Sequence, residues 1–204
     1  GQTQVQIRMA QPGPSRHTKD WIAMDLYNYI LGGGGFSSRL MKVIRSEMGE
    51  TYGIGSAYRG GEYDGMFILY TFTENEKLYR TMRVIKGELE KFASQGVTDE
   101  ELKYAKANRI GGYPLRFETL GGTTQAITSG LRFSSLKDVQ LYPVLVDAIE
   151  QSDIDAAIDK HFLPGNFAIV LLGDPGVFGE VAKVAELYGI KPDEIERVNW
   201  LEIE

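Results

Sequence analysis

The strand–turn–strand segment at residues 52–73 constrains the fold of this chain more than any other feature. From Tyr52 to Tyr58 large side chains alternate with small ones, and residues 66–73 form a second strand pattern. Only the stretch RGGEYDG separates them, which is typical of a hairpin connection. A parallel pair needs a connection of about a dozen residues or more, so this pair is expected to be antiparallel. The chain is therefore built around antiparallel strands.

Two further strands are indicated near the ends of the chain. Val5, Ile7 and Met9 alternate with polar residues, which is the pattern of a half-buried strand, and QPGPS then breaks the chain. Residues 167–172, FAIVLL, are apolar throughout. A continuous apolar run is typical of a strand covered on both faces, so we expect this strand to be internal in its sheet.

Helical spacing of apolar residues covers most of the remaining chain. The first helix is predicted over residues 18–31, with Gly32 as its C-terminal stop. A capping box of Thr98 and Glu101 starts another helix, and Ser152 is expected to cap a later one. Further helices are predicted over residues 39–48, 75–94, 124–133, 141–150, 152–162 and 176–188.

The order of these elements is strand, two helices, two strands, several helices, strand, helix. This order indicates the α+β class, with one mixed or antiparallel sheet and helices packed on one face. No repeat, low-complexity tract or linker divides the sequence, so residues 1–204 are interpreted as a single domain. A chain of this length can bury roughly 70% of its unfolded surface, which suffices for a core without disulfides or metals.

Charge and composition exclude several classes of function. The net charge is −6 and the pI is near 5.1, which argues against a nucleic-acid or anionic-membrane partner. The sequence has no cysteine, so disulfides and thiolate metal sites are excluded. No apolar run reaches the ~20 residues of a membrane span. The compartment stays open between cytoplasm and periplasm.

The two histidines do not have the spacing of a metal site. His17 and His161 have no partner histidine three or four positions away, and one imidazole does not make a zinc site. The sequence also lacks the G-x-S-x-G motif of a serine nucleophile. We therefore expect no metal ligands in this chain and interpret both histidines as structural or surface residues.

The glycine run at residues 32–35 has two interpretations. It follows a helix, and no Lys-Ser or Lys-Thr comes after it, so it is not a phosphate loop. It is either a helix stop with a flexible connection, or a mobile loop whose bare backbone touches a ligand.

Arg45 and Tyr52 are candidate functional residues. Arg45 lies at the margin of the apolar stripe of its helix, so its guanidinium can reach past the helix end. Tyr52 opens the next strand, so the two polar tips can converge at the rim of the sheet. A charged fork and a phenolic donor suit a carbonyl or carboxylate, but the spacing alone favours a structural Arg–Tyr contact or a helix-end cap.

The segment LGGGGFSSRLMKVIRSEMGETYGIGS resembles the second-half domain of the insulinase-type (pitrilysin) zinc peptidases, which include the mitochondrial processing peptidases. The matching pattern is a glycine cluster, then Ser38-Arg39-Leu40, then Arg45, Gly49 and Tyr52. The initial QTQVQIRMAQPG and the later LPGNFAIVLLGD are similar to the first and last strands of that domain.

The resemblance implies a division of labour between two domains that close over an extended peptide. The zinc would be held by a homologous partner domain or subunit, with no cofactor in this chain. Arg45 and Tyr52 would hold the peptide backbone and support the oxyanion. Gly33, Gly34, Gly35 and Phe36 lie where the non-catalytic processing-peptidase subunit carries its glycine-rich substrate loop, so they are candidate substrate-binding residues.

Several departures keep other functions open. The run 32–35 is shorter than the family loop, and Glu50-Thr51 stand where relatives carry apolar and small residues. The zinc motif is missing, which fits either the C-terminal half of a longer chain or an inactive subunit. One alternative is a structural subunit like the core proteins of respiratory complex III. Another is a stand-alone module that binds a peptide at a sheet edge.

Overall fold

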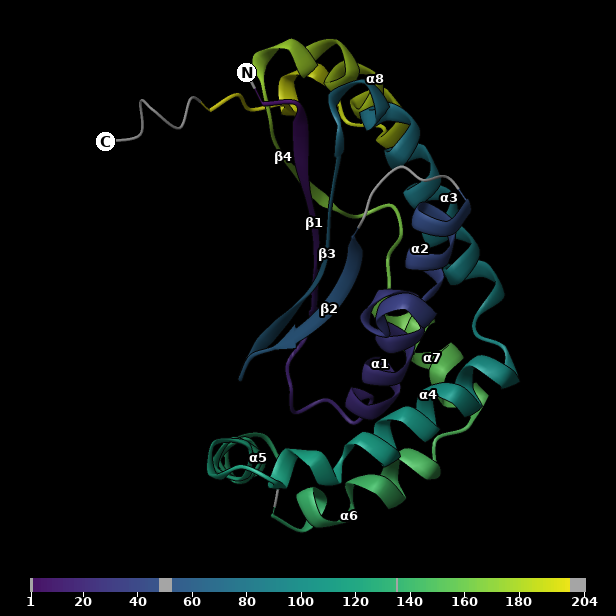
Figure 1. Cartoon of the computed structure of the whole chain (residues 1–204), viewed down its shortest axis with the longest axis vertical. Coiled ribbons are helices and arrows are strands. Elements are labelled where there is room, and N and C mark those ends of the chain that lie inside the picture. The colour runs from purple at the N-terminus through teal and green to yellow at the C-terminus, as the bar shows by residue number, and fades with distance from the viewer. Residues whose placement is uncertain (1, 48–52, 135, 199–204) are drawn as a thin grey trace.

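The structure is a computed structural model that describes residues 2–47, 53–134 and 136–198, with the backbone alone for residues 45–47. Its sheet has four antiparallel strands in the order β2-β3-β1-β4. In chain order the strands are β1 (Gln4–Pro14), β2 (Ile54–Gly60), β3 (Asp64–Glu74) and β4 (Ala168–Leu172). Figure 1 shows that helices cover one face of this sheet and leave the other face open.

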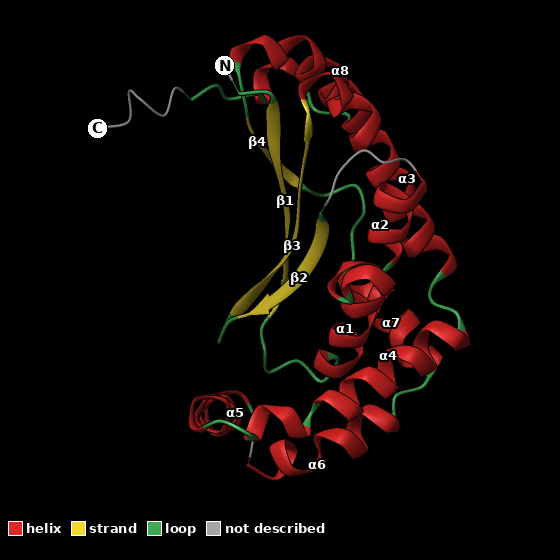
Figure 2. Cartoon of the chain, viewed as in Figure 1, coloured by secondary structure: helices red, strands yellow, loops and turns green. Residues whose placement is uncertain are grey.

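The helices form a layer along the sheet and an extension beyond its end (Figure 2). The layer contains α1, α2, α3, α7 and α8, whereas α4, α5 and α6 continue past the hairpin end, and α5 reaches toward the open side. In the part of the chain described, no helix is long and apolar enough to cross a membrane. The bounds are α1 (Trp21–Asn28), α2 (Arg39–Met41), α3 (Leu78–Gln95), α4 (Asp99–Gly112), α5 (Leu120–Phe133), α6 (Leu136–Asp147), α7 (Gln151–His161) and α8 (Phe178–Tyr188).

The core lies between the sheet and the helix layer because the strands alternate. Val5, Ile7 and Met9 of β1 are fully buried, as predicted, and Phe67 and Leu69 of β3 lie on the same face. Residues between them point to the open face. The predicted α+β class, with helices packed on one face of the sheet, is confirmed.

Two predictions about strands are wrong. β4 is the end strand of the described sheet and not an internal one, and its Val170 and Leu172 are half exposed or more on the open face. Ile169 and Leu171 pack against the core, so the run is apolar on both faces although helices cover only one of them. β1 also continues through Pro12 and Pro14, because β4 pairs only as far as Ala10 and leaves an open edge that tolerates proline.

Two predictions about helix ends are also wrong. The helical turn does not stop at Gly32: α1 passes into a π-helical turn, η1 (Tyr29–Gly33), which packs against β2. A second π-helical segment, η3 (Lys42–Glu47), follows α2. The cap of α7 is Glu150 and not Ser152, since the Asp153 carboxylate accepts a hydrogen bond from the Glu150 amide at 2.8 Å.

The predicted capping box of α4 is present and is tied to α2 by an ion pair. The Thr98 hydroxyl accepts from the Glu101 amide, and the Glu101 carboxylate accepts from the Thr98 amide. Arg39 Nε and Nη2 each donate to this carboxylate at 2.6 Å, and Nη2 also donates to the Gly96 carbonyl. Burial raises the pKa of Glu101, but the hydrogen bonds from Arg39 and Thr98 outweigh it and lower the pKa to about 2.

This ion pair makes stability depend on acidic pH. The folded pKa of Glu101, about 2, lies below its ordinary value of 4.5, so its contribution is present above pH 4.5 and is lost as the pH falls toward 2. Both side chains keep some solvent exposure, so we expect Glu101→Gln to lower the free energy of unfolding by only about 1–2 kcal/mol at pH 7. Urea unfolding at pH 7 and pH 3 should show a smaller loss on acidification in the variant than in the wild type. Glu100→Gln, on the same turn, is the control and should change little; equal acid sensitivity of wild type and Glu101→Gln would contradict the assignment.

Candidate functional site

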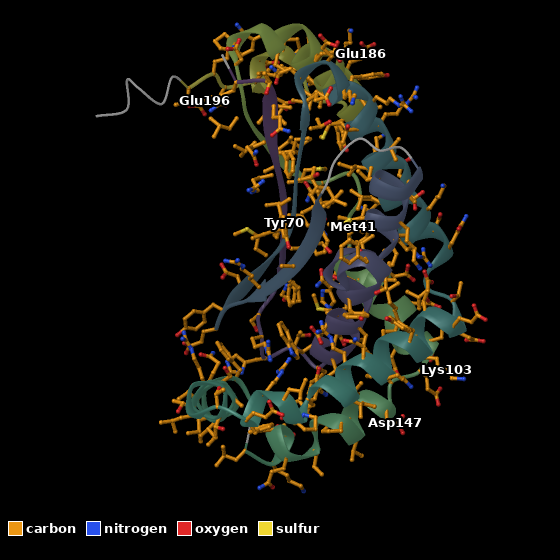
Figure 3. All side chains as sticks on the ribbon, viewed as in Figure 1. Met41, Tyr70, Lys103, Asp147, Glu186 and Glu196 are labelled. Carbon is orange, nitrogen blue, oxygen red and sulfur yellow. The ribbon has the colours of Figure 1, made fainter. Side chains whose placement is uncertain are left out.

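A cavity of about 330 Å³ lies where the start of β2 meets the glycine turn, residues 32–35, that follows α1. It joins the open face of the sheet to the helix side: Figure 3 shows Tyr70 on the side away from the helices and Met41 on the helix side. Its lining residues come from β1, the glycine turn, α2, β2 and β3, and they are Gln6, Arg8, Gly32, Gly33, Gly35, Met41, Gly53, Ile54, Gly55, Tyr70, Thr71 and Phe72.

Strand register brings three lining residues into one row on the open face. Gly55, Tyr70 and Arg8 lie directly opposite one another on β2, β3 and β1. A Cβ on Gly55 would stand 2.7 Å from the Tyr70 hydroxyl, so the missing side chain lets Tyr70 lie across β2. The Arg8 guanidinium lies 5.9 Å from the centre of the Tyr70 ring, within the range of a cation–π contact.

The glycine turn is shaped by close packing more than by flexibility. A Cβ on Gly32 would lie 2.5 Å from Ser56 Oγ and 2.7 Å from the Ser56 amide nitrogen of β2. On Gly33 and Gly34 a Cβ would come within 2.7 Å of the preceding helical turn. Only Gly35, with φ of +60°, has a backbone conformation that favours glycine. Bare backbone therefore forms one wall of the cavity.

Arg8 is the charged residue of the lining. Its Nη1 donates to the carbonyls of Ile7 at 2.8 Å and Thr71 at 3.3 Å. No carboxylate lines the cavity or pairs with Arg8 within the described ranges. The Phe72 side chain supplies apolar surface on the open face, whereas Ile54 and Met41 contribute to the helix side of the cavity. The arrangement suits a ligand that offers both backbone polar groups and negative charge.

The structure brings some of the predicted site residues together and leaves others untested. Gly33 and Gly35 line the cavity, whereas Gly34 packs on the preceding turn and Phe36 points to solvent with 74% of its surface exposed. Tyr52 and the Arg45 side chain lie outside the described residues, so their predicted convergence stays a prediction. The cavity does include Gly53, which directly follows Tyr52 in the sequence.

The histidines have packing and hydrogen-bonding roles in the described structure. His161 Nε2 lies 2.6 Å from Asp20 Oδ2, where α7 ends beside the start of α1. Hydrogen bonds from Lys160 and His161 lower the pKa of Asp20. His17 makes an edge contact with the Phe133 ring. Among the residues that the structure describes, no three potential metal ligands gather.

A second polar cluster, between α1, α4 and α6, is held together by contacts within the domain. The Asp25 carboxylate accepts from Arg109 at 2.8 Å and from the Tyr142 hydroxyl at 3.2 Å. Arg16 lies 3.2 Å above the centre of the Trp21 ring, and burial lowers its pKa to about 10. The bonds to Asp25 hold α4 and α6 of the helical extension to α1, so we assign the cluster a structural role.

Sequence reasoning missed Arg8 and Tyr70. Arg8 is visible as a lone charge on the polar side of the first strand, but its neighbours depend on register. A slip of one residue would place a different residue opposite it and turn its side chain to the other face. The short RGGEYDG turn restricts the β2–β3 register but says nothing of β1.

The architecture is that of a peptidase-type α+β domain. A solved peptidase M16 inactive domain from Pseudomonas fluorescens superposes with a TM-score of 0.75 at 27% identity, over 82% of this chain and 40% of that one. The description of the peptidase M16 inactive domain matches residues 1–109, more than half of the chain. The chain therefore belongs to the peptidase M16 inactive-domain family, as its resemblance indicated.

The curated relatives are bacterial and longer. An uncharacterized zinc protease of Mycobacterium tuberculosis is 26% identical over 176 residues, which is 86% of this chain and 39% of that protein. A non-peptidase homolog of Helicobacter pylori is 32% identical over 117 residues, or 57% of this chain and 27% of that protein. The chain thus spans well under half of these relatives. M16 inactive domains pair with catalytic domains, and in this family the zinc site belongs to the catalytic domain.

The close approach of the glycine turn to β2 can be tested by adding one methyl group. Gly32→Ala should lower the free energy of unfolding by about 2 kcal/mol, because the new Cβ meets backbone that cannot move aside. Urea unfolding measures the change. Gly87→Ala, in α3 with open space around it, is the matched control and should raise stability by up to ~1 kcal/mol. Equal stability of Gly32→Ala and wild type would show that the approach is not a constraint.

Proposed function

We propose that this chain is the non-zinc half of a zinc peptidase and helps to bind and position an extended peptide. Hydrolysis would take place at the zinc of a partner domain of the same family. In this proposal residues 1–204 form one domain. The observation that carries it is the cavity, because it brings together the glycine turn and the start of β2. Gly33 and Gly53, which both line it, are 20 positions apart in the sequence.

The composition of the cavity supports a peptide as ligand. Bare glycine backbone allows close approach of another main chain, and Gln6 and Thr71 offer polar groups beside apolar surface. The open face gives an extended chain access without unfolding the domain. These features suit a backbone-directed contact better than recognition of one compact small molecule.

Arg45 and Tyr52 are proposed to complete the site. Zinc in the partner domain would polarise the scissile carbonyl and activate a water molecule. The guanidinium of Arg45 would hold the peptide carbonyls by paired hydrogen bonds. The Tyr52 hydroxyl would donate to the oxygen on which negative charge develops during attack.

A structural subunit without peptidase assistance is the second candidate. The observation in its favour is the similarity to the Helicobacter pylori protein described as a non-peptidase homolog. A scaffold needs the fold and the domain interface but not a guanidinium and a phenol near a cavity. The two functions therefore differ in what they require of Arg45 and Tyr52.

Cleavage kinetics with the zinc-bearing domain separate these candidates. We expect Arg45→Ala and Tyr52→Phe each to lower kcat/KM for an extended peptide by ~10²–10³, the usual loss for one oxyanion donor. Domain association, followed by analytical ultracentrifugation, should not change.

Arg83→Ala, an exposed arginine on the helix side, is the charge-matched control and should keep full activity. If both site variants cleave as fast as wild type while the complex still forms, the chain is a scaffold.

A further inference from the structure

Arg8 has hydrogen-bonding capacity that the described part of the chain does not use. A guanidinium carries five N–H donors in a rigid fork. In the described structure the Arg8 fork makes two hydrogen bonds, both from Nη1 to backbone carbonyls on its own side of the sheet. Other arginines of the chain, such as Arg39 and Arg109, are paired with carboxylates. Arg8 is thus a cation at the wall of a cavity, without an anionic partner among the residues that the structure describes.

The neighbours of Arg8 hold it in place instead of neutralising it. The Tyr70 ring lies beside the guanidinium, and Gly55 gives that ring room to lie flat across β2. The two backbone bonds fix the direction of Nη1. Since the orientation is set before a ligand arrives, less conformational entropy is lost when the remaining donors bind.

The surroundings of Arg8 favour a negatively charged group of the peptide at this position. The chain carries a net charge of −6, so most of its surface repels an acidic peptide. The cavity departs from this, because its lining has one arginine and no acidic residue among the described residues. Phe72 lies on the same face of β3 as Tyr70, so it adds apolar surface to the open-face side of the cavity.

We propose that Arg8, supported by Tyr70, forms a subsite for a carboxylate of the bound peptide. The carboxylate comes either from an aspartate or glutamate side chain or from the C-terminus of the peptide. Both present the planar pair of oxygens that an arginine fork accepts. This inference rests on the proposed function and adds a substrate class to it: peptides that carry a carboxylate near the bond to be cleaved.

Paired peptides test the subsite in the complex with the zinc-bearing domain. One extended peptide is made as a series in which each member carries a single glutamate at a different position. Each member has a neutral twin with glutamine at that position. A further pair carries glutamine only and ends in either a free or an amidated C-terminus. Wild type should favour one glutamate position, or the free C-terminus, by about tenfold in kcat/KM. Arg8→Gln should remove that preference, so that the favoured carboxylate peptide is cleaved no faster than its neutral twin.

Two matched variants separate the role of the fork from net charge. Arg59→Gln removes the same charge from the same open face, on β2 but away from the cavity, and should keep the preference. Arg8→Lys keeps the charge without the fork and should retain only part of it. Equal effects of Arg8→Gln and Arg59→Gln would overturn the proposal.

A binding measurement keeps this inference separate from the proposed function. The Arg8 Nε–H resonance of ¹⁵N-labelled protein is followed by NMR during titration with the favoured peptide and its neutral twin. A shift caused by the carboxylate peptide alone supports the subsite even if Arg45 and Tyr52 prove inert. If cleavage depends on Arg45 and Tyr52 but the Arg8 resonance and the kinetics ignore the carboxylate, the subsite is wrong and the proposed function stands.

Discussion

The close contact between the glycine turn and β2 is the constraint on which the candidate site depends. At Gly32 the helical backbone comes so near Ser56 that no side chain fits between them. A buried hydrogen bond of 2.8 Å from the Ser56 hydroxyl to the Asn28 side chain fixes the same junction. This contact carries Gly33 and Gly35 to the rim of the sheet, where they meet the start of β2 and enclose the cavity.

Arg39 and Arg45 both lie in the segment that carries the family resemblance, but we assign them different roles. Arg39 has a structural role, and Arg45 has a proposed functional one. Arg39 binds the Glu101 carboxylate with both arms of its fork, so it joins α2 to the beginning of α4. Its charge is used within the fold and is not available to a ligand. Arg45 lies six residues later, in the segment that leads toward β2, and is the residue proposed to reach a peptide. Arg8, in the lining of the cavity, has no internal carboxylate partner in the described structure.

Local patterns in the sequence predicted the elements better than their relations. The alternation around Val5 and Ile7, the short β2–β3 turn and the Thr98 capping box each depend on residues close in sequence, and the structure contains all three. The apolar run of β4 did not predict its position at the end of the sheet. That position depends on which strands pair with β4, and these lie far away in the sequence.

The candidate site was predictable only in part for the same reason. The glycine run marked one wall, but a run of glycines does not tell a helix stop from a turn packed against a strand. The pairing of Arg8 with Tyr70 comes from contacts between strands more than 60 positions apart, and nothing local encodes it. The roles of Arg45 and Tyr52 come from the family resemblance and stay proposals.

Photo-crosslinking at the cavity tests most directly whether a peptide lies there. The photoreactive residue p-benzoylphenylalanine replaces Tyr70 at the cavity or, as a control, the exposed Tyr104 on the helix side. With the zinc-bearing domain and a slowly cleaved peptide present, the account predicts peptide crosslinks from position 70 and none from position 104. Peptide attached at position 104 but not at position 70 would contradict it.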